Sequence, residues 1–361
     1  MTTKIIICLD GCGPEYIARS ETPNLDALAR EGYSTIGQAI VPTVTNVNNA
    51  TIVTARFPEI HGITSNYYYD HLRGQEVYME SPEVVLTDTI FRRVARKGEK
   101  SALLTAKDKL KTLIQDGTTI AESAEKPSPW LVERIGAPPD IYSLEVNHWL
   151  FQAAISVLRR DSPDLLYLTT TDYATHMLCP EDDRSQWNIN QLDRLIGDIL
   201  VVPSDLEVVI TADHGMSPKT HALDLNQIMK EAGIIAQAIP IIKDRYIVHH
   251  QNLGGAAYVY LNDLSTMNET IEILKEEKGI EAVLTNMDAA RRYNLHPKRI
   301  GHLFVLADAD TVFGALPTAR EEVNIRSHGS LHEREIPIYA YGAGPLSVLP
   351  KSNHEVAAWI R

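Results

Sequence analysis

Short apolar runs recur along the first part of the chain, and each ends at polar residues. Their length and β-branched content predict buried strands. These runs occupy residues 4–9, 35–41, 101–105, 164–169 and 206–211. Apolar positions at helical spacing lie between them, at residues 22–32, 89–97, 145–160 and 186–200. Strands that alternate with helices in this way predict an α/β fold with a doubly wound, mostly parallel sheet sandwiched by helices.

Two of the predicted helices begin with recognisable signals. Thr22 is expected to cap the first helix, with Pro23 at its first position and Gly32 at its end. The segment from Thr266 to Glu269 has the spacing of a capping box, in which the two side chains bond each other's backbone N–H groups.

The pattern of elements changes after Met216. Shorter strands and helices follow, predicted at residues 254–261, 266–277, 281–284, 287–293 and 303–306. A last buried strand at 336–341 resembles those of the first part. We therefore expect a core formed by residues 1–216 and 326–361, interrupted by a small inserted α+β cap at 217–325.

Composition and charge narrow the class of protein. The chain has 361 residues, of which 44% are hydrophobic and 22% charged, as in ordinary globular proteins. The formal net charge of −13 argues against nucleic acid or an anionic membrane as the main partner. A small anionic substrate remains compatible, because a metal site can reverse the local field. Three cysteines without a CxxC motif favour a cytoplasmic protein, and the oligomeric state stays open, with a homodimer as one alternative.

Polar residues follow the predicted strands of the core. Asp10, the segment 43–45, Asp172, and Asp213 with His214 each come directly after an apolar run. Because ligands bind beyond the carboxyl ends of strands in such sheets, we expect these side chains to converge on one edge.

The same residues have the composition of a metal site. Asp172 and His176 are spaced i, i+4 and would share one face of a helix. His328 supplies a further imidazole, with His332 as its competitor. Three aspartates and three histidines without a thiolate suit two Zn²⁺ ions, and manganese or iron are alternative metals. An Asp after a strand is also a common helix cap, so the joint placement carries the prediction.

The stretch from Pro42 to Thr54 carries the candidate nucleophile. A threonine where a loop enters a helix, here predicted at about 46–55, lies near unpaired backbone N–H groups that can hold a phosphoryl group. The alternative is a threonine that only caps the helix. Spacing alone does not separate Thr45 from Thr43 as the attacking hydroxyl. Asn66, in the following turn, could donate its side-chain N–H to the same phosphoryl oxygens.

These motifs together resemble the alkaline phosphatase superfamily, on its nucleotide pyrophosphatase/phosphodiesterase-like branch. The resemblance covers nearly the whole chain. The matching segments, in family order, are Asp10-Gly, Thr22-Pro-Asn-Leu-Asp, Pro-Thr-x-Thr45, Arg56 to Ile63, Asp172-x3-His176, Asp213-His214-Gly and Ser-His328-Gly.

The resemblance implies roles for individual residues. The second threonine of Pro-Thr-x-Thr is the family's nucleophile, which favours Thr45 over Thr43, and the His before Gly is the ligand, which favours His328 over His332. Asn66 matches the phosphoryl-binding asparagine. One zinc ion would be held by Asp172, His176 and His328. The other would be held by Asp10, Asp213 and His214, and would also bind Thr45.

Within this branch the chain is most similar to the phosphonoacetate hydrolases. The segments that carry this similarity are Asp10 to Tyr16, Thr45 to Asn49, and Thr105 to Leu110. The last contains Lys107 and Lys109, which match that group's substrate-binding lysines. In an extended segment these two side chains would point the same way, and the alternative is a solvated edge strand.

The resemblance implies a zinc-dependent hydrolase that cleaves the C–P bond of phosphonoacetate to acetate and phosphate through a phosphorylated Thr45. Cations at the carboxylate end would stabilise the enediolate that leaves. One alternative is a nucleotide pyrophosphatase or phosphodiesterase acting on phosphate mono- or diesters. A second, of another class, is a non-catalytic metal-binding relative. Val44 and Val47 depart from the residues expected in the hydrolase and leave other phosphonates open.

Overall fold

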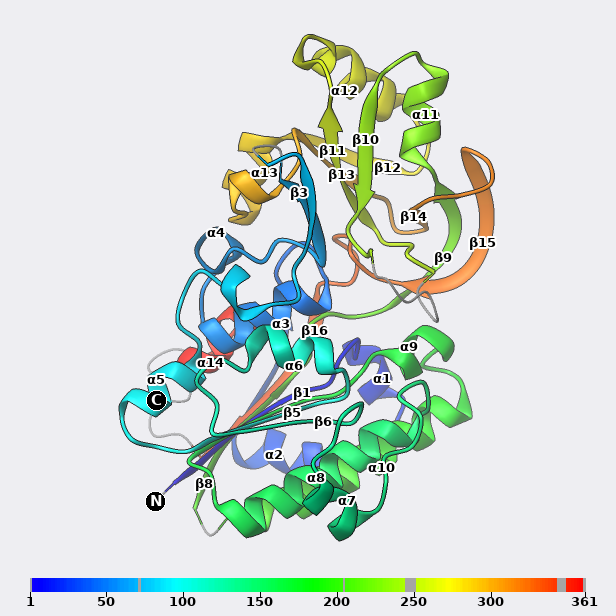
Figure 1. The fold of residues 1–361 in the computed structure, drawn as a ribbon. Coiled ribbons are helices and arrows are strands. Elements are labelled where there is room, and N and C mark those ends of the chain that lie inside the picture. Colours follow the sequence, from blue (N-terminus) through cyan, green and yellow to red (C-terminus); the bar gives the residue numbers. More distant parts are fainter. Residues whose placement is uncertain (1, 71–72, 204, 244–250, 343–348, 360–361) are drawn as a thin grey trace.

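The computed structural model of the protein describes residues 2–70, 73–203, 205–243, 251–342 and 349–359. Its central feature is a seven-stranded sheet in the order β2-β16-β8-β1-β7-β5-β6 (Figure 1). The strands are β1 Thr3–Cys8, β2 Tyr33–Gln38, β5 Ser101–Thr105, β6 Ile120–Ser123, β7 Leu165–Thr169, β8 Leu206–Thr211 and β16 Glu335–Tyr341. Neighbours pair in parallel except at β16, which runs antiparallel to both β2 and β8. The predicted fold class is confirmed.

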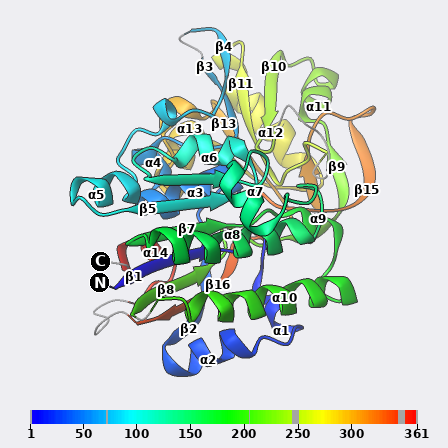
Figure 2. The same cartoon turned by 60° about the horizontal axis from the view of Figure 1, so that its bottom comes forward.

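Helices bury both faces of this sheet, as its continuous apolar strands require (Figure 2). In β1, Ile6 faces one helical layer and Ile5 and Ile7 face the other. The first layer contains α3 Thr45–Thr54, α5 Ile90–Arg96, α6 Asp108–Ile114 and α14 Asn353–Trp359. The second contains α1 Pro14–Ala18, α2 Pro23–Glu31, α7 Pro129–Ile135, α8 Glu145–Asp161 and α10 Asp183–Leu200. The large sheet is thus a rigid platform for whatever follows its strands.

Residues 217–327 form two further sheets above the carboxyl ends of the central strands (Figure 1). The first has the order β14-β9-β15, with β9 Ser217–Leu223, β14 Thr311–Phe313 and β15 Arg320–Ser327. The second is antiparallel in the order β10-β11-β13-β12, with β10 Ala236–Pro240, β11 Ala256–Leu261, β12 Ile280–Thr285 and β13 Leu303–Ala307. Their helices are α11 Leu225–Glu231, α12 Met267–Glu276 and α13 Asn286–Tyr293.

No helix of the described residues is long and apolar enough to span a bilayer.

Two local expectations about the central sheet were wrong. The strand expected at 35–41 is β2, Tyr33–Gln38, so it ends earlier. It ends because the side chain of Asn48 takes both backbone groups of Ile40, its Oδ1 accepting from the N–H at 2.8 Å and its Nδ2 donating to the carbonyl at 3.2 Å. Thr22 also makes no side-chain cap. Instead Asp193 accepts hydrogen bonds from the N–H groups of Asn24 and Leu25, at 3.1 and 2.9 Å.

The capping box predicted at Thr266 does not form. The Thr266 hydroxyl donates to the Asp263 carbonyl at 2.7 Å, and α12 has no side-chain cap. A short 3-10 turn at Leu264–Thr266 precedes the helix and brings that carbonyl within reach. The helix itself begins where the sequence predicts, since its apolar face packs onto β12 whatever caps it.

Candidate active site

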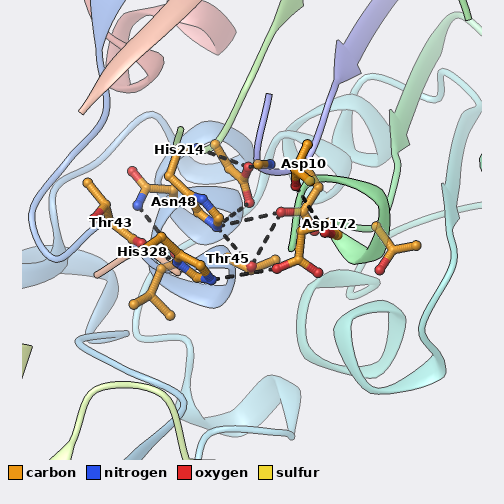
Figure 3. A network of polar contacts seen from close by, with 12 residues as sticks. Asp10, Thr43, Thr45, Asn48, Asp172, His214 and His328 are labelled. Atoms are coloured by element: carbon orange, nitrogen blue, oxygen red, sulfur yellow. Dashed lines mark hydrogen bonds and ion pairs between the residues drawn. The ribbon is translucent and has the colours of Figure 1, made fainter. Parts of the chain in front are cut away.

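All six predicted metal ligands converge above the carboxyl edge of the central sheet, where Figure 3 shows several of them around Thr45. Asp10 follows β1, Asp172 follows β7, and Asp213 and His214 follow β8. His176 lies on α9, Tyr173–Met177, and His328 comes directly after β15. Every one of these side chains is buried, at most 6% exposed. This placement confirms the prediction that the strand ends would bring Asp10, Asp172, Asp213 and His214 together.

The ligand atoms fall into two overlapping groups. Those of Asp10, Asp213 and His214 lie within 4.8 Å of one another, as do those of Asp172, His214 and His328. His176 belongs beside the second group, because its Nε2 is 3.2 Å from Asp172 Oδ2. The division predicted from sequence is compatible with this geometry, although His214 borders both groups. Its ring stacks on that of His328 with centroids 3.7 Å apart.

The three histidines present the same ring nitrogen to the centre of the site. Each has its Nδ1 against a backbone carbonyl, which can only accept, so Nδ1 carries a proton, and in the neutral ring the lone pair lies on Nε2. His176, His214 and His328 bond the carbonyls of Arg326, Gly215 and Thr43 at 2.8, 2.9 and 2.7 Å. A backbone partner on the far nitrogen is the usual way to orient a metal-binding imidazole.

Electrostatics in this cluster favour a bound cation. Burial first, and then the neighbouring charge of Asp213, raise the pKa of Asp10 well above its ordinary value. Burial likewise raises the pKa of Asp213 to about 6. Burial, followed by the proximity of His328, lowers the pKa of His214. Buried carboxylates that repel one another, beside the imidazole of His214 that burial keeps neutral, are a donor set that divalent cations compensate. The residues therefore fit the predicted metals, whose identity is not fixed by this geometry.

Glycine is required directly after Asp10. Gly11 has a φ of +69°, and a Cβ there would lie 2.5 Å from the Thr175 hydroxyl. Its N–H donates to Asp213 Oδ1 at 3.1 Å, and the N–H of His214 donates to the same oxygen at 2.9 Å. The turn after β1 therefore carries the carboxylate of Asp10 and, through the N–H of Gly11, also holds the carboxylate of Asp213.

Two of the three asparagines after Thr45, Asn48 and Asn49, support the site with hydrogen bonds. Asn49 donates to Asp213 Oδ2 at 3.1 Å and accepts from the Tyr167 hydroxyl at 2.7 Å. Asn48 fixes the loop before α3 by donating to the carbonyls of Ile40, Pro42 and Val44. The sequence showed that asparagines crowd here, but their spacing gave no partner. Only the packing of α3 on β7 and β8 assigns them.

Thr45 is the hydroxyl that the site exposes. It opens α3, and its Oγ1 lies 3.2 Å from His214 Nε2 and 3.4 Å from Asp10 Oδ1. The remaining residues of that helix are buried, whereas Thr45 is partly exposed. Thr43 is 0% exposed, and its hydroxyl donates to the Ser330 carbonyl at 2.9 Å. The geometry thus supports Thr45 over its rival as the attacking group.

Asn66 lies close to the first turn of α3. Its carbonyl accepts from Met79 N–H at 3.0 Å, and the Met79 carbonyl accepts from Asn46 Nδ2 at 3.3 Å. Asn66 Oδ1 is buried and has no hydrogen-bond partner among the described residues. The predicted role of Asn66 is to donate its amide N–H to a phosphoryl oxygen. That role stays a prediction.

The expected extended geometry of the two lysines was wrong. Lys107 is the residue before α6, and Lys109 lies inside that helix, whose first turn is fixed by Asp108 bonding Lys111 at 2.5 Å. The strand before them, β5, lies between β7 and β6, so the edge-strand alternative fails as well. Lys107 Nζ nevertheless lies 3.7 Å from Asp172 Oδ1, which places it at the metal-binding cluster.

The second lysine has a partner that sequence reasoning missed. Lys109 Nζ lies 3.0 Å from Glu80 Oε1, and both side chains are about a quarter exposed, at 23% and 25%. Glu80 follows Met79, which bonds both Asn66 and Asn46. No motif surrounds Glu80, and only the fold brings it opposite the lysine.

His332, the alternative metal ligand, lies away from the cluster and bonds Glu281 at 2.6 Å.

Comparison with solved structures identifies close structural relatives. Crystal structures of phosphonoacetate hydrolase from Sinorhizobium meliloti 1021, in complex with phosphonoformate and with phosphonoacetate, match with a TM-score of 0.89 and 30% identity. The match covers 99% of this chain and 94% of that chain. Human ectonucleotide pyrophosphatase/phosphodiesterase 5 matches with a TM-score of 0.75 at 18% identity, over 99% and 94% of the two chains. That second likeness shows the fold alone.

Curated relatives point to the same family at greater distance. A pyrophosphatase/phosphodiesterase from Schizosaccharomyces pombe is 25% identical over 228 residues, which is 60% of this chain and 45% of that protein. A venom phosphodiesterase from Naja atra is 25% identical over 226 residues, or 59% and 26%. The chain therefore spans less than half the length of these curated relatives.

A family model described as type I phosphodiesterase / nucleotide pyrophosphatase matches residues 4–331. This range contains the Thr45 turn and all six residues of the histidine–aspartate cluster. The chain belongs to the type I phosphodiesterase / nucleotide pyrophosphatase family of the alkaline phosphatase superfamily.

Proposed function

We propose that the protein is a zinc-dependent hydrolase that cleaves the C–P bond of phosphonoacetate to acetate and phosphate. The observation that carries this proposal is the position of Lys107, 3.7 Å from Asp172 and hence beside the cluster that surrounds Thr45. The similarity to the Sinorhizobium phosphonoacetate hydrolase supports the same substrate. Manganese and iron remain alternative metals for the same donor set.

In this proposal Asp172, His176 and His328 hold one ion, and Asp10, Asp213 and His214 hold the other together with Thr45. When bound, two such ions lower the pKa of a hydroxyl and neutralise charge on a phosphonate. Asn66 donates its amide N–H to the phosphoryl oxygens, and the N-terminus of α3 faces them. The ligand side chains are buried and the histidines are held by hydrogen bonds, so they need to move little when the ions and the substrate bind.

The reaction then needs a stabilised leaving carbon. Thr45 Oγ attacks phosphorus and releases its proton to solvent water, while the electrons of the breaking C–P bond pass to carbon and onto the adjacent carboxylate as an enediolate. Lys107 and Lys109 stabilise the negative charge on the carboxylate oxygens. A carbanion without an adjacent carboxylate would keep the charge on carbon, away from the lysines. A proton from water converts the enediolate to acetate. Water then attacks the phosphorus of phospho-Thr45, releasing phosphate and returning a proton to the hydroxyl.

The test is a substrate profile of purified, zinc-loaded protein. We expect phosphate release from phosphonoacetate to exceed cleavage of a nitrophenyl nucleotide ester, with both lost after chelation and restored by zinc. Elemental analysis of the protein as purified identifies its metal. Negligible release from phosphonoacetate beside efficient nucleotide ester cleavage would contradict the proposal.

That outcome would favour the second candidate function, a nucleotide pyrophosphatase or phosphodiesterase. The family model and the curated relatives support this alternative. It uses the same nucleophile and metals, because the leaving group alone differs. The discriminating feature is the lysine end of the site, which a nucleotide does not require. Complete inactivity on both substrates in the metal-loaded protein would instead indicate a non-catalytic metal-binding relative.

A further inference from the structure

A fully buried ion pair lies behind the candidate metal ligands. Lys219 on β9 places its Nζ 2.8 Å from Glu333 Oε1, and both side chains are 0% exposed. The ammonium also donates to the Ala309 carbonyl at 2.8 Å. Burying two charges is expensive, and well-packed apolar residues often give a fold equal or greater stability. The stability of the fold alone therefore does not account for this pair.

Glu333 makes hydrogen bonds with every part of its carboxylate. Its Oε2 accepts from Ser330 N–H at 3.0 Å and from Ser330 Oγ at 2.7 Å, while Oε1 accepts from Ser217 Oγ. Burial would raise the pKa of Glu333, but the charge of Lys219 and these hydrogen bonds outweigh it and lower the pKa. The carboxylate is therefore held ionised and fixed, and it fixes Ser330 in turn.

Ser330 connects this pair to the active site through Thr43. The Ser330 carbonyl accepts from Thr43 Oγ1 at 2.9 Å, and the same hydroxyl accepts from Gly329 N–H at 2.9 Å. The Thr43 carbonyl then accepts from His328 Nδ1 at 2.7 Å. Figure 3 shows Thr43 beside His328, with Thr45 two residues further along the same segment. A single chain of contacts thus runs from Lys219 to a metal ligand and to the nucleophile's loop.

We propose that Lys219 and Glu333 are positioning residues for the reaction, acting through Ser330 and Thr43 on His328 and the Thr45 loop. This inference rests on the proposed role of His328 as a metal ligand. A backbone contact already joins the loop after β8 to the loop before β16, since Gly215 N–H donates to the Glu333 carbonyl at 2.8 Å. The side chains are then needed for the orientation of Ser330 rather than for holding the segments together.

The principal test is Glu333→Gln, which keeps the size of the side chain and removes its charge. Its amide nitrogen cannot accept from Ser330. We expect zinc affinity, measured by competition with a chelating dye, to fall about 10–100-fold, as for other residues that orient metal ligands. At saturating zinc we expect a lower kcat with KM nearly unchanged, for phosphonoacetate and for a nitrophenyl ester alike.

Asp193→Asn is the matched control. Asp193 is another buried carboxylate, 1% exposed, that accepts from backbone N–H groups, here those of Asn24 and Leu25 on the far layer of helices. We expect this variant to lose stability against urea while zinc affinity stays at the wild-type value. The inference is overturned if Glu333→Gln behaves in the same way, losing stability but keeping zinc affinity and kcat.

Two further variants keep the test decisive if Glu333→Gln fails to fold. The double variant Lys219→Met/Glu333→Leu replaces the pair by apolar groups and should remain folded. Ser330→Ala removes one donor to Glu333 and leaves the ion pair intact. Both should weaken zinc binding, Ser330→Ala by less, and wild-type zinc affinity in a folded double variant would overturn the inference. Zinc affinity and nitrophenyl ester turnover are read without phosphonoacetate, so failure of the proposed substrate is distinguishable.

Discussion

The candidate metal-binding cluster and the lysine end of the site differ in how firmly they are held. In the cluster, each histidine is oriented by a backbone carbonyl and each ligand side chain is at most 6% exposed. At the other end, Lys107 and Lys109 are 31% and 23% exposed and lie against Asp172 and Glu80. The first region is organised without a ligand, whereas in the proposed reaction the lysines would exchange these carboxylate partners for the substrate.

This difference suggests how chemistry and specificity are divided. Phosphoryl transfer needs exact placement of a nucleophile and charges, which a rigid sheet edge supplies. The choice of leaving group depends on a few charged side chains near the opening, and their energies are modest because water and neighbouring carboxylates compete. We therefore expect changes in the cluster to abolish turnover of every substrate, and changes at the lysine end to alter the preference among substrates.

The largest expected effect comes from the nucleophile. Thr45→Ala should lower kcat by about 10⁴-fold or more, since loss of a nucleophile removes the covalent route. Phosphate release from phosphonoacetate and from a nitrophenyl ester measures this. Thr54→Val is the control on the same helix, because among the described residues the Thr54 hydroxyl bonds the Ala50 carbonyl, at 2.7 Å, and no group of the cluster. Full turnover by Thr45→Ala would place the chemistry elsewhere.

A smaller and selective loss is expected at Lys107. Lys107→Met should lower kcat/KM for phosphonoacetate by about 10²-fold, the usual cost of removing one group that stabilises developing charge. Turnover of a nitrophenyl ester should fall much less, because its leaving group needs no carboxylate contact. Lys111→Met is the matched control, as Lys111 pairs with Asp108 on the same helix. Equal losses on both substrates would contradict the assignment of Lys107 to the carboxylate.

Glu80 should act in the opposite direction. Glu80→Gln removes the charge that competes with the substrate for Lys109, so KM for phosphonoacetate should fall by about 2–5-fold, the range expected for a partly exposed ion pair. KM for the nitrophenyl ester should not change. Glu76→Gln serves as the control, since Glu76 lies 3.7 Å from Lys243 instead. An unchanged or higher KM for phosphonoacetate would show that Glu80 does not compete for Lys109.

The last expected effect is on stability rather than turnover and concerns the support behind α3. His61 is buried, bonds the Thr51 hydroxyl at 3.0 Å, and has its pKa lowered to about 3, mainly by burial and then by Arg299. The unfolded chain binds the proton more readily, so stability should fall as pH drops from about 6.5 towards 3. Between pH 7 and pH 5 the loss should be about 2 kcal/mol.

Urea unfolding of the metal-free protein at these two pH values measures the loss. His61→Gln retains a hydrogen-bonding group without a titration in this range. Its stability should therefore decrease less between pH 7 and pH 5 than that of the wild type. Equal decreases would assign the pH dependence to other groups, such as the carboxylates of the cluster.

The sequence by itself determined the features that follow from strand periodicity. Apolar runs of β-branched residues predicted the central strands, and a parallel sheet necessarily gathers their carboxyl ends at one edge. That rule places Asp10, Asp172, Asp213 and His214 together from the sequence alone. The i, i+4 spacing of Asp172 and His176 also predicted that the two side chains lie close together, because helix α9 begins directly after Asp172.

Only the tertiary structure decided contacts between segments that no local pattern links. Asp193 rather than Thr22 caps α2, because α10 packs against it. Glu80 meets Lys109 because the 3-10 turn that follows it, Pro82–Val84, contacts α6. Lys107 keeps an extended backbone but Lys109 does not, because helix α6 begins at Asp108, which short-range propensity did not reveal. Local sequence fixes which backbone forms are accessible, whereas partners are selected by packing and charge over the whole chain, and these depend on long-range contacts.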